Sequence, residues 1–244
     1  MSASAEPVGA GVGWVDVTTF ELAASAPFFE RLFGWEREDV GMADAPGYSL
    51  LRSGGEIVAA IDPVPEEKGP PQWTVFVVVP DLEAALAAIE REGGAAKLRC
   101  EAILEHGMLG LALDPAGAEF GLWEARASMP ARAGALPGRV IGAEVEVPDP
   151  AAAARFYGAA FGWRELPGAE PGTALLDAGG LPVAIAAGEA PGWTPWLGVA
   201  DLGAALARAR ELGADVIREG GQAALLAGPE DARFGLREFG AGLP

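Results

Sequence analysis

Alternating and helical patterns of apolar residues predict a strand, a helix and a hairpin at the start of the chain. Apolar and polar residues alternate over residues 12–18, as expected for a strand with one buried face. Over residues 23–33 apolar residues recur at spacings of four, which is typical of a helix, and Gly34 is suited to end it. Residues 48–52 and 57–61, separated by the turn residues SGGE, indicate a hairpin.

Similar elements follow along the rest of the chain. Asp81 is a suitable N-cap for the next helix. The further predicted elements are a loop over 62–71, strands over 73–79, 110–113, 119–123, 140–147, 196–199 and 234–238, helices over 81–92, 151–161 and 202–212, and a hairpin over 173–186. We therefore expect an α+β fold of four units, each with a strand, a helix and two or three more strands.

Whole phrases of the sequence occur twice in the same order. FFERLFGW at 28–35 returns as FYGAAFGW at 156–163, PDLEAAL at 80–86 as ADLGAAL at 200–206, and GAEFGL at 117–122 as DARFGL at 231–236. A repeat this long suits two tandem globular domains rather than a solenoid. We expect a first domain over 8–126, a linker rich in Ala, Pro and Gly over 127–138, and a second domain over 139–241.

Composition and charge narrow the range of partners. Half of the residues are hydrophobic, yet no apolar run approaches the roughly 20 residues that span a bilayer. The first residues lack the pattern of a signal peptide, and Cys100 is the only cysteine, so we expect a cytoplasmic protein without a disulfide. The net charge of −18, with no cluster of Lys and Arg, argues against nucleic-acid binding.

The order of these phrases resembles the vicinal oxygen chelate superfamily. The resemblance rests on three motifs: a helix ending in F-Y-x-x-x-F-G-W, a helix beginning D-L-x-x-A-L, and the closing turn after Asp114-Pro115. That superfamily includes glyoxalase I, extradiol dioxygenases and bleomycin-resistance proteins, and the chain looks most similar to its tandem glyoxalase-like members. The resemblance implies paired βαβββ units whose mixed sheets curl around a cavity. A tandem chain already holds the units of a family homodimer, so either a monomer or a homodimer is expected.

The resemblance also implies where a metal ion would be bound, and these positions lack ligands. Metal-dependent members place His and Glu on inward-facing strand positions. The corresponding residues here are Trp14, Thr74 and Gly121 in the first half and Gly142, Thr194 and Gly235 in the second. Indole, methyl groups and hydrogen cannot hold a divalent cation, and a threonine hydroxyl holds one poorly. His106, the only histidine, is expected in a turn. We therefore expect neither a metal nor another cofactor.

Aromatic and charged residues are expected to line the cavity instead. If Trp14 faces inward, strand alternation directs Asp16 to the same side. The candidate ligand-binding residues are Trp14, Tyr48, Thr74, Phe76, Trp123, Thr194, Trp196 and Arg237. The candidate acid–base residues are Asp16, Glu144 and Glu146, although the two glutamates could equally face water on an open sheet. Trp35 and Trp163 follow helix ends and are expected to be packing residues.

Three functions remain open at this stage. The first is metal-independent binding of an aromatic or polycyclic small molecule, as in antibiotic resistance or as an accessory of biosynthesis. The second is a cofactor-free enzyme of secondary metabolism, in which partly desolvated carboxylates act as acid or base. The third is a metal-dependent lyase or dioxygenase with unusual ligands such as Asp16 and Glu144.

Overall fold

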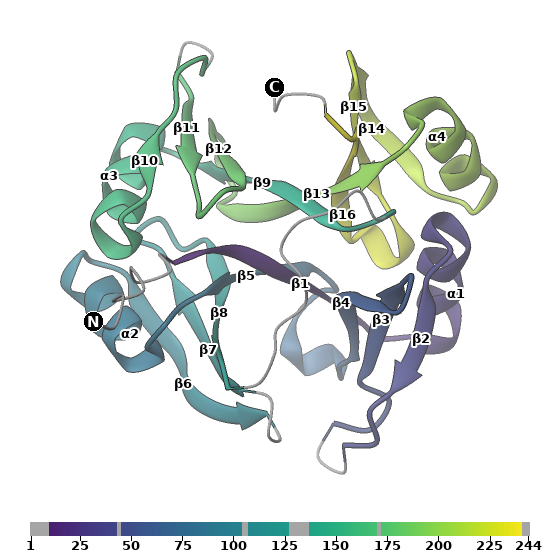
Figure 1. Cartoon of the computed structure of the whole chain (residues 1–244), viewed down its shortest axis with the longest axis horizontal. Helices are drawn as coiled ribbons and strands as arrows, with labels where there is room; N and C mark the ends of the chain where they lie inside the picture. Colours follow the sequence, from purple (N-terminus) through teal and green to yellow (C-terminus); the bar gives the residue numbers. More distant parts are fainter. Residues whose placement is uncertain (1–9, 43–44, 104–106, 127–136, 170–171, 241–244) are drawn as a thin grey trace, which may run out of the picture. The chain divides into compact units, whose positions relative to one another are not determined.

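The described residues of the first half form two α-helices, one short 3-10 helix and eight strands. The computed structural model describes residues 10–42, 45–103, 107–126, 137–169 and 172–240. The elements are β1 (Gly11–Thr19), α1 (Leu22–Phe33), β2 (Glu36–Asp39), β3 (Ser49–Ser53), β4 (Glu56–Pro63), the short 3-10 helix η1 (Glu66–Lys68), β5 (Trp73–Val78), α2 (Leu82–Arg91), β6 (Ala95–Ile103), β7 (Gly107–Leu113) and β8 (Glu119–Ala125) (Figure 1). The predicted turn at His106 lies outside the described residues, as do residues 127–136 of the predicted linker.

The second half repeats this order. Its elements are β9 (Val140–Val147), α3 (Pro150–Phe161), β10 (Arg164–Glu165), β11 (Ala174–Asp177), β12 (Pro182–Ala187), β13 (Gly192–Val199), α4 (Leu202–Glu211), β14 (Asp215–Gly220), β15 (Ala223–Ala227), η2 (Pro229–Asp231) and β16 (Arg233–Glu238). The α+β fold of repeated strand–helix–strands units is therefore confirmed. In the described part of the chain no helix is long and apolar enough to cross a membrane.

Each half contributes one mixed sheet of eight strands. The strand orders are β2-β3-β4-β1-β5-β8-β7-β6 and β10-β11-β12-β9-β13-β16-β15-β14. The pairs β1/β4, β5/β8, β9/β12 and β13/β16 are parallel. The sequence patterns did not predict β2, β6, β10 and β14, and these four are the outer strands of the two sheets. They also did not predict β15, which pairs with β14.

Two compact units cross the boundary between the halves. The unit that we call the α2–α3 unit contains α2 and β6–β8 of the first half with α3, β10–β12 and most of β9 of the second. The other, the α1–α4 unit, contains α1, β2–β4 and most of β1 with α4, β14–β16 and most of β13. The division falls inside β1, β5, β9 and β13. Each unit thus takes one βαβββ module from each half of the sequence.

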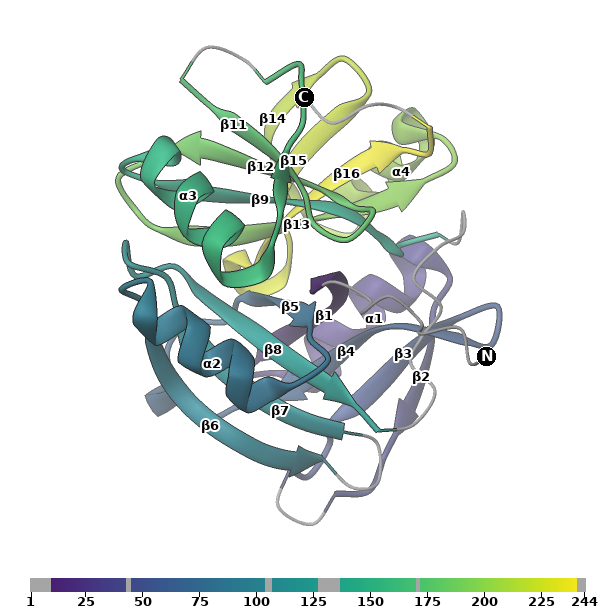
Figure 2. The ribbon, with the colours of Figure 1, turned by 60° about the vertical axis from the view of Figure 1, so that its left-hand side comes forward.

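Aromatic rings fill the core of the α2–α3 unit. Here α2 lies beside α3 (Figure 2). Phe120 of the first half makes an edge contact with Tyr157 of the second, with ring centroids 6.0 Å apart. Trp163 packs on Tyr157 and is 5% exposed, which confirms its expected packing role. The Tyr157 hydroxyl donates a hydrogen bond of 2.9 Å to Asp114 Oδ2, and backbone N–H groups of the closing turn donate to Oδ1 of the same carboxylate. This buried acceptor is therefore satisfied and joins the two modules.

A similar aromatic cluster fills the core of the α1–α4 unit. In this unit α1 lies beside α4 (Figure 1). Phe29 of α1 and Phe234 of β16 lie with ring centroids 6.0 Å apart. Trp35 stacks on Phe33 at 4.5 Å and is 4% exposed, so it too is a packing residue, as expected. Such aromatic pairs stabilise a core beyond the area that they bury.

A glutamate from the second half binds the segment at the start of the first helix. The carboxylate of Glu230 accepts hydrogen bonds from the Phe20 backbone N–H at 3.1 Å and the Ser25 hydroxyl at 3.0 Å, and Thr19 donates to it as well. The N-cap residue of α1, Glu21, makes no capping bond with its own side chain. Glu230 has a φ of 55°, a conformation that is strained for a residue other than glycine. The hydrogen bonds to its carboxylate offset this strain.

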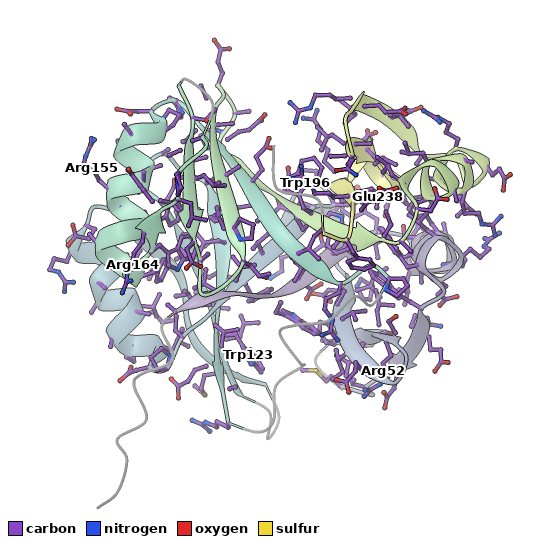
Figure 3. All side chains as sticks on the ribbon, turned by 45° about the horizontal axis from the view of Figure 1, so that its top comes forward. Arg52, Trp123, Arg155, Arg164, Trp196 and Glu238 are labelled. Atoms are coloured by element: carbon purple, nitrogen blue, oxygen red, sulfur yellow. The ribbon has the colours of Figure 1, made fainter. Side chains whose placement is uncertain are left out.

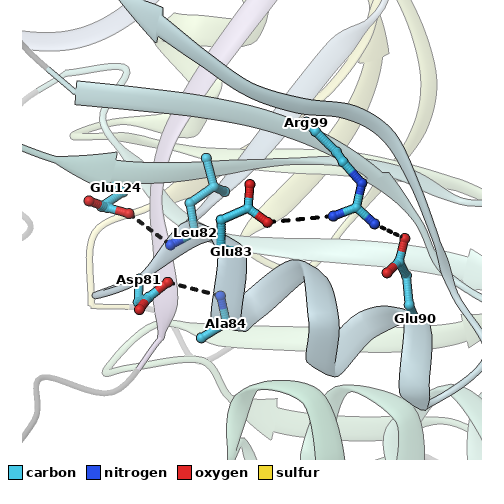
Figure 4. A network of polar contacts seen from close by, with 7 residues as sticks. All are labelled: Asp81, Leu82, Glu83, Ala84, Glu90, Arg99 and Glu124. Atoms are coloured by element: carbon cyan, nitrogen blue, oxygen red, sulfur yellow. Dashed lines mark hydrogen bonds and ion pairs between the residues drawn. The ribbon is translucent and has the colours of Figure 1, made fainter.

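Helices α2 and α4 are capped in matching ways, as Figure 4 shows for α2. Asp81 accepts from the Ala84 backbone N–H at 2.9 Å, which confirms its predicted N-cap role. Glu124, from the end of β8, accepts from the Leu82 backbone N–H at 2.8 Å. In the second half Asp201 and Glu238 make the corresponding bonds at the start of α4. The closing strand of each half is thereby fixed to the helix of its own module.

Candidate functional site

The sheet in the α1–α4 unit has one face in the core and one that carries the candidate residues. On β1, Val15 and Val17 are 0% and 1% exposed, whereas Trp14 is partly exposed. Strand alternation directs Trp14 and Asp16 to the side away from this core. We call this side of β1, β3 and β4 the Asp16 face.

A tyrosine and a second carboxylate accompany Asp16 on this face. Asp16 pairs with Ala60 of β4, and Thr18, two residues later, pairs with Asp62. Because paired residues of neighbouring strands point to the same side, Asp62 lies on the Asp16 face. The hydroxyl of Tyr48, just before β3, donates a hydrogen bond to the Asp16 carboxyl. In the described structure Asp16 Oδ1 is buried without a hydrogen-bond partner.

Burial controls the protonation of this cluster. Together with the charge of Asp62 it raises the pKa of Asp16 to about 8, against the opposing effect of the hydrogen bond from Tyr48. Burial also raises the pKa of Asp62, against the opposing effect of Lys68. The pKa of Tyr48 lies well above its ordinary value because of burial and the two nearby carboxylates. A carboxyl group with a pKa near 8 can hold or release a proton in neutral solution.

Asp62 is the residue of this cluster that the sequence patterns missed. We expected a loop from residue 62 onward, but β4 extends to Pro63 and carries Asp62 on the Asp16 face. No alternation marked this position, because residues 58–61 are all apolar. The Thr18 hydroxyl, by contrast, exchanges hydrogen bonds with the Gln72 backbone and holds the chain next to β5. Thr74 is partly exposed on β5.

Aromatic rings cover the glycines of the two closing strands. Phe76 of β5 pairs with Gly121 of β8, and a Cβ atom at position 121 would overlap the Phe76 ring. In the second half Trp196 of β13 pairs with Gly235 of β16, and a Cβ atom there would overlap the indole in the same way. Figure 3 labels Trp196, which is 2% exposed. The chain therefore uses glycine at both positions to make room for a flat ring.

These rings decide whether the metal site of the superfamily fits this chain. The closing-strand position is one of those at which metal-dependent members hold a ligand, and any side chain there would displace an aromatic ring. Among the described residues no three His, Cys, Asp or Glu side chains come together as a cation site. The residues at the expected ligand positions therefore do not fit a divalent metal ion.

The remaining candidate residues lie in different surroundings. Trp123, in the α2–α3 unit, is partly exposed, and its indole leaves no room for a Cβ atom at Gly107. Glu144 of β9 is 9% exposed and pairs with Ala184, and Glu146 is less buried and packs on Gly188. Neither glutamate belongs to the α1–α4 unit that contains Asp16.

Thr194, Trp196 and Arg237 belong to the α1–α4 unit, but on another part of it than Asp16. Thr194 is partly exposed and lies two residues before Trp196 on β13. Arg237 of β16 is 6% exposed and pairs with Gly198 of β13. Burial lowers the pKa of its guanidinium group. The structure thus brings Asp16 together with Tyr48 and Trp196 together with Arg237, in two separate groups.

A surface cleft of the α1–α4 unit contains none of these residues. It has a volume of about 320 Å³ and lies between α1 and the end of α4, where Phe28, Arg31 and Leu212 line it. Because no candidate residue lines it, this cleft is not part of the candidate site.

The fold and the two copies of the repeat place the chain in a family. It matches the family of the glyoxalase-like domain twice, over residues 14–123 and 142–237. The chain therefore belongs to the glyoxalase-like domain family, within the vicinal oxygen chelate superfamily.

Relatives of similar length share about a third of the residues. The chain is 30% identical over 258 residues to the anthracycline biosynthesis protein DnrV of Streptomyces peucetius, covering 95% of this chain and 94% of that protein. It is 29% identical to the anthracycline biosynthesis protein DauV of Streptomyces sp. (strain C5), with the same coverage. It is 30% identical over 241 residues to CFP32 of Mycobacterium tuberculosis (strain CDC 1551 / Oshkosh), covering 91% and 92% of the two chains.

Solved structures show the same fold at low sequence identity. The Mn(II)-bound glyoxalase of Novosphingobium aromaticivorans superposes with a TM-score of 0.73 at 14% identity, over 94% of this chain and 82% of that one. The E323L variant of homoprotocatechuate 2,3-dioxygenase from Brevibacterium fuscum gives a TM-score of 0.69 at 16% identity. The match covers 97% of this chain and 73% of that chain. At these identities the likeness shows the fold alone.

Proposed function

We propose that the chain binds an aromatic or polycyclic small molecule in secondary metabolism, without a metal ion at the position that the superfamily uses for one. The observation that carries this proposal is the pair of rings on the closing strands, Phe76 over Gly121 and Trp196 over Gly235. Flat hydrophobic surfaces replace metal ligands there, and such surfaces stack on flat organic molecules.

The relatives support the same class of ligand. DnrV and DauV are named as anthracycline biosynthesis proteins, and anthracyclines are polycyclic aromatic compounds. This supports a role as a biosynthetic accessory protein, or in the binding of an aromatic antibiotic.

Calorimetric titration with the hydroxyanthraquinone emodin tests this proposal. We expect saturable binding that EDTA treatment does not change, and several-fold weaker binding by Trp14→Leu because one stacking surface is lost. Ile217→Ala, which shortens an apolar side chain 47% exposed on β14, is the matched control and should bind as the wild type does. Loss of binding on EDTA treatment, or no saturable heat from the folded protein, would contradict the proposal.

The raised pKa of Asp16 favours a second candidate function, acid–base catalysis on the bound aromatic molecule. An Asp16 carboxylate, which holds the hydrogen bond from Tyr48, could accept a proton from a carbon next to a carbonyl group. The carbon–hydrogen electron pair then moves into the enolate, and return of the proton restores the substrate. Glu144 and Glu146 remain alternative acid–base groups on the other unit.

Exchange of the α-hydrogens of α-tetralone in D₂O, followed by proton NMR, measures this proton transfer without a cofactor. Because the carboxylate is the base, the exchange rate should rise with pH and level off above the Asp16 pKa of about 8. Asp16→Asn should abolish the exchange, whereas Asp215→Asn, at an exposed position, should not change it. An equal rate in Asp16→Asn would remove Asp16 as the base, and a loss in Glu144→Gln would assign the role to Glu144.

A further inference from the structure

Three buried N–H donors lie on one face of β13 and β16. They are Nε1 of Trp196 and Nε and Nη1 of Arg237, and none has a hydrogen-bond partner in the described part of the chain. Trp196 is 2% exposed and Arg237 is 6% exposed, so solvent reaches little of either side chain. A buried donor without an acceptor costs free energy, and for a charged guanidinium the cost is larger.

The register of the two strands brings the donors to the same face. Trp196 pairs with Gly235, and Gly198 pairs with Arg237, so the four residues form two neighbouring pairs. Residues two apart on a strand share a face, and so do paired residues of parallel neighbours. The opposite face of β16 carries Phe234 and Leu236, both 0% exposed in the core. We call the side with Trp196 and Arg237 the Arg237 face.

Two aromatic rings stand beside the guanidinium on this face. The Trp196 indole covers Gly235, and the ring of Phe239 covers Gly198. Gly235 and Phe239 precede and follow Arg237 by two residues on the same side of the chain. The guanidinium thus lies between the indole that covers Gly235 and the phenyl ring of Phe239. This arrangement suits a flat ligand.

The carboxylate next to Arg237 in the sequence is engaged elsewhere. Glu238, the next residue, points to the other face, where it accepts from the Leu202 backbone N–H at 3.0 Å. On β15, Ala223 pairs with Arg237 and Leu225 pairs with Gly235, and neither has a polar side chain. The residues paired with Arg237 and Gly235 on β13 and β15 therefore offer no acceptor side chain.

We propose that the Arg237 face binds the carboxylate of an aromatic acid, which accepts hydrogen bonds from the Arg237 guanidinium and the Trp196 indole N–H. A guanidinium matches a carboxylate because its N–H groups are arranged in a planar fork. The two rings take the aromatic part of the ligand. This site is distinct from the Asp16 face, and it extends the proposed function by naming an anionic group that the ligand carries.

Calorimetric titration with 2-naphthoate, and with the neutral 2-naphthamide as its match, tests this inference. We expect 2-naphthoate to bind at least about 10-fold more tightly than the amide, because charge-assisted hydrogen bonds are about twice as strong as neutral ones. Arg237→Met keeps an unbranched apolar stem and removes the donors, and it should weaken the binding of 2-naphthoate roughly 10- to 100-fold. Trp196→Phe keeps a ring over Gly235 but removes the N–H, and it should weaken the binding of 2-naphthoate several-fold.

Arg233→Met is the matched control. Arg233 is exposed on the same strand, so its loss changes the net charge equally but should leave 2-naphthoate binding unchanged. Arg237→Lys, which keeps the charge, gives a second variant if the methionine variant fails to fold, and it should also bind more weakly because the fork is lost.

The inference would be overturned by no saturable binding of 2-naphthoate to the wild type, by equal affinity in folded Arg237→Met or Arg237→Lys, or by an equal loss in Arg233→Met. Competition with inorganic phosphate separates the two sources of negative charge. Weak competition is expected for an aromatic carboxylate site, and stronger binding of phosphate than of 2-naphthoate would contradict it. Binding of emodin without any binding of 2-naphthoate would leave the proposed function intact and remove this inference alone.

Discussion

Replacing Asp16 with asparagine should make the stability of the protein much less dependent on pH. The side chain is 9% exposed, and burial raises its pKa from 3.8 to about 8. The native state therefore keeps the Asp16 proton over a pH range in which the unfolded chain has lost it. Asparagine has a similar shape and never ionises, so the substitution removes this proton and leaves the packing nearly unchanged.

The sign and size of the effect follow from proton linkage. The group contributes fully below the unfolded pKa of 3.8, and its contribution is lost as the pH rises to the folded value of about 8. Between these limits the native state binds one proton more than the unfolded state, so the free energy of unfolding falls by about 1.4 kcal/mol per pH unit. Between about pH 5 and about pH 7, the free energy of unfolding of Asp16→Asn should therefore rise by about 3 kcal/mol relative to that of the wild type.

Urea unfolding of both proteins at a series of pH values between about 5 and 9 measures this difference. Asp215→Asn is the control, because that carboxylate is exposed at the start of β14, and its curve should stay parallel to that of the wild type. If the curves for Asp16→Asn and the wild type are parallel as well, Asp16 ionises as an ordinary surface carboxylate. The argument for a buried proton on the Asp16 face would then be wrong.

Three further substitutions test the packing and the links between the modules by urea unfolding. Glu230→Ala should cost about 2 kcal/mol, because the start of α1 loses its acceptor. Tyr157→Phe should cost about 1.5 kcal/mol, because the buried Asp114 carboxylate loses one of its donors. Gly235→Ala should cost about 1–3 kcal/mol, because the new methyl group overlaps the Trp196 ring.

Exposed glycines provide the comparison for the last of these. An alanine at Gly220 meets nothing within 4 Å, so Gly220→Ala should change the free energy of unfolding little. Equal stability of Gly235→Ala and Gly220→Ala would show that Trp196 does not lie over the closing strand. Unchanged stability of Glu230→Ala or Tyr157→Phe would show that the corresponding hydrogen bonds do not hold the two modules together.

The helices and the inner strands except β15 could be predicted from the sequence, but the outer strands could not. Strands with a buried face alternate visibly, as at residues 12–18, and the helices show caps such as Asp81. β2 has the sequence ERED with every residue exposed, and β14 is exposed at five of its six positions. Charged residues are common on outer strands because they discourage pairing with other chains, and they also hide the alternation.

The candidate site was predictable one strand at a time but not as a group. Alternation on β1 was enough to place Asp16 opposite the core side chains. The partnership with Asp62 depends on the register of β1 against β4, between segments far apart along the chain, and no local pattern encodes it. The ring over Gly121 is another example, because the sequence shows a glycine but not the Phe76 side chain that requires it.

The sharing of each compact unit between both halves has a consequence for how the chain reaches its native state. When a ribosome has made only the first half, α1 lacks the acceptor from Glu230, which is 210 residues beyond Phe20. Neither aromatic cluster can be completed before its partner module has been synthesised. Contacts between such distant segments slow folding, since a long loop must close before they form. We therefore expect a late folding step, after release of the full chain, and poor autonomous folding of either half.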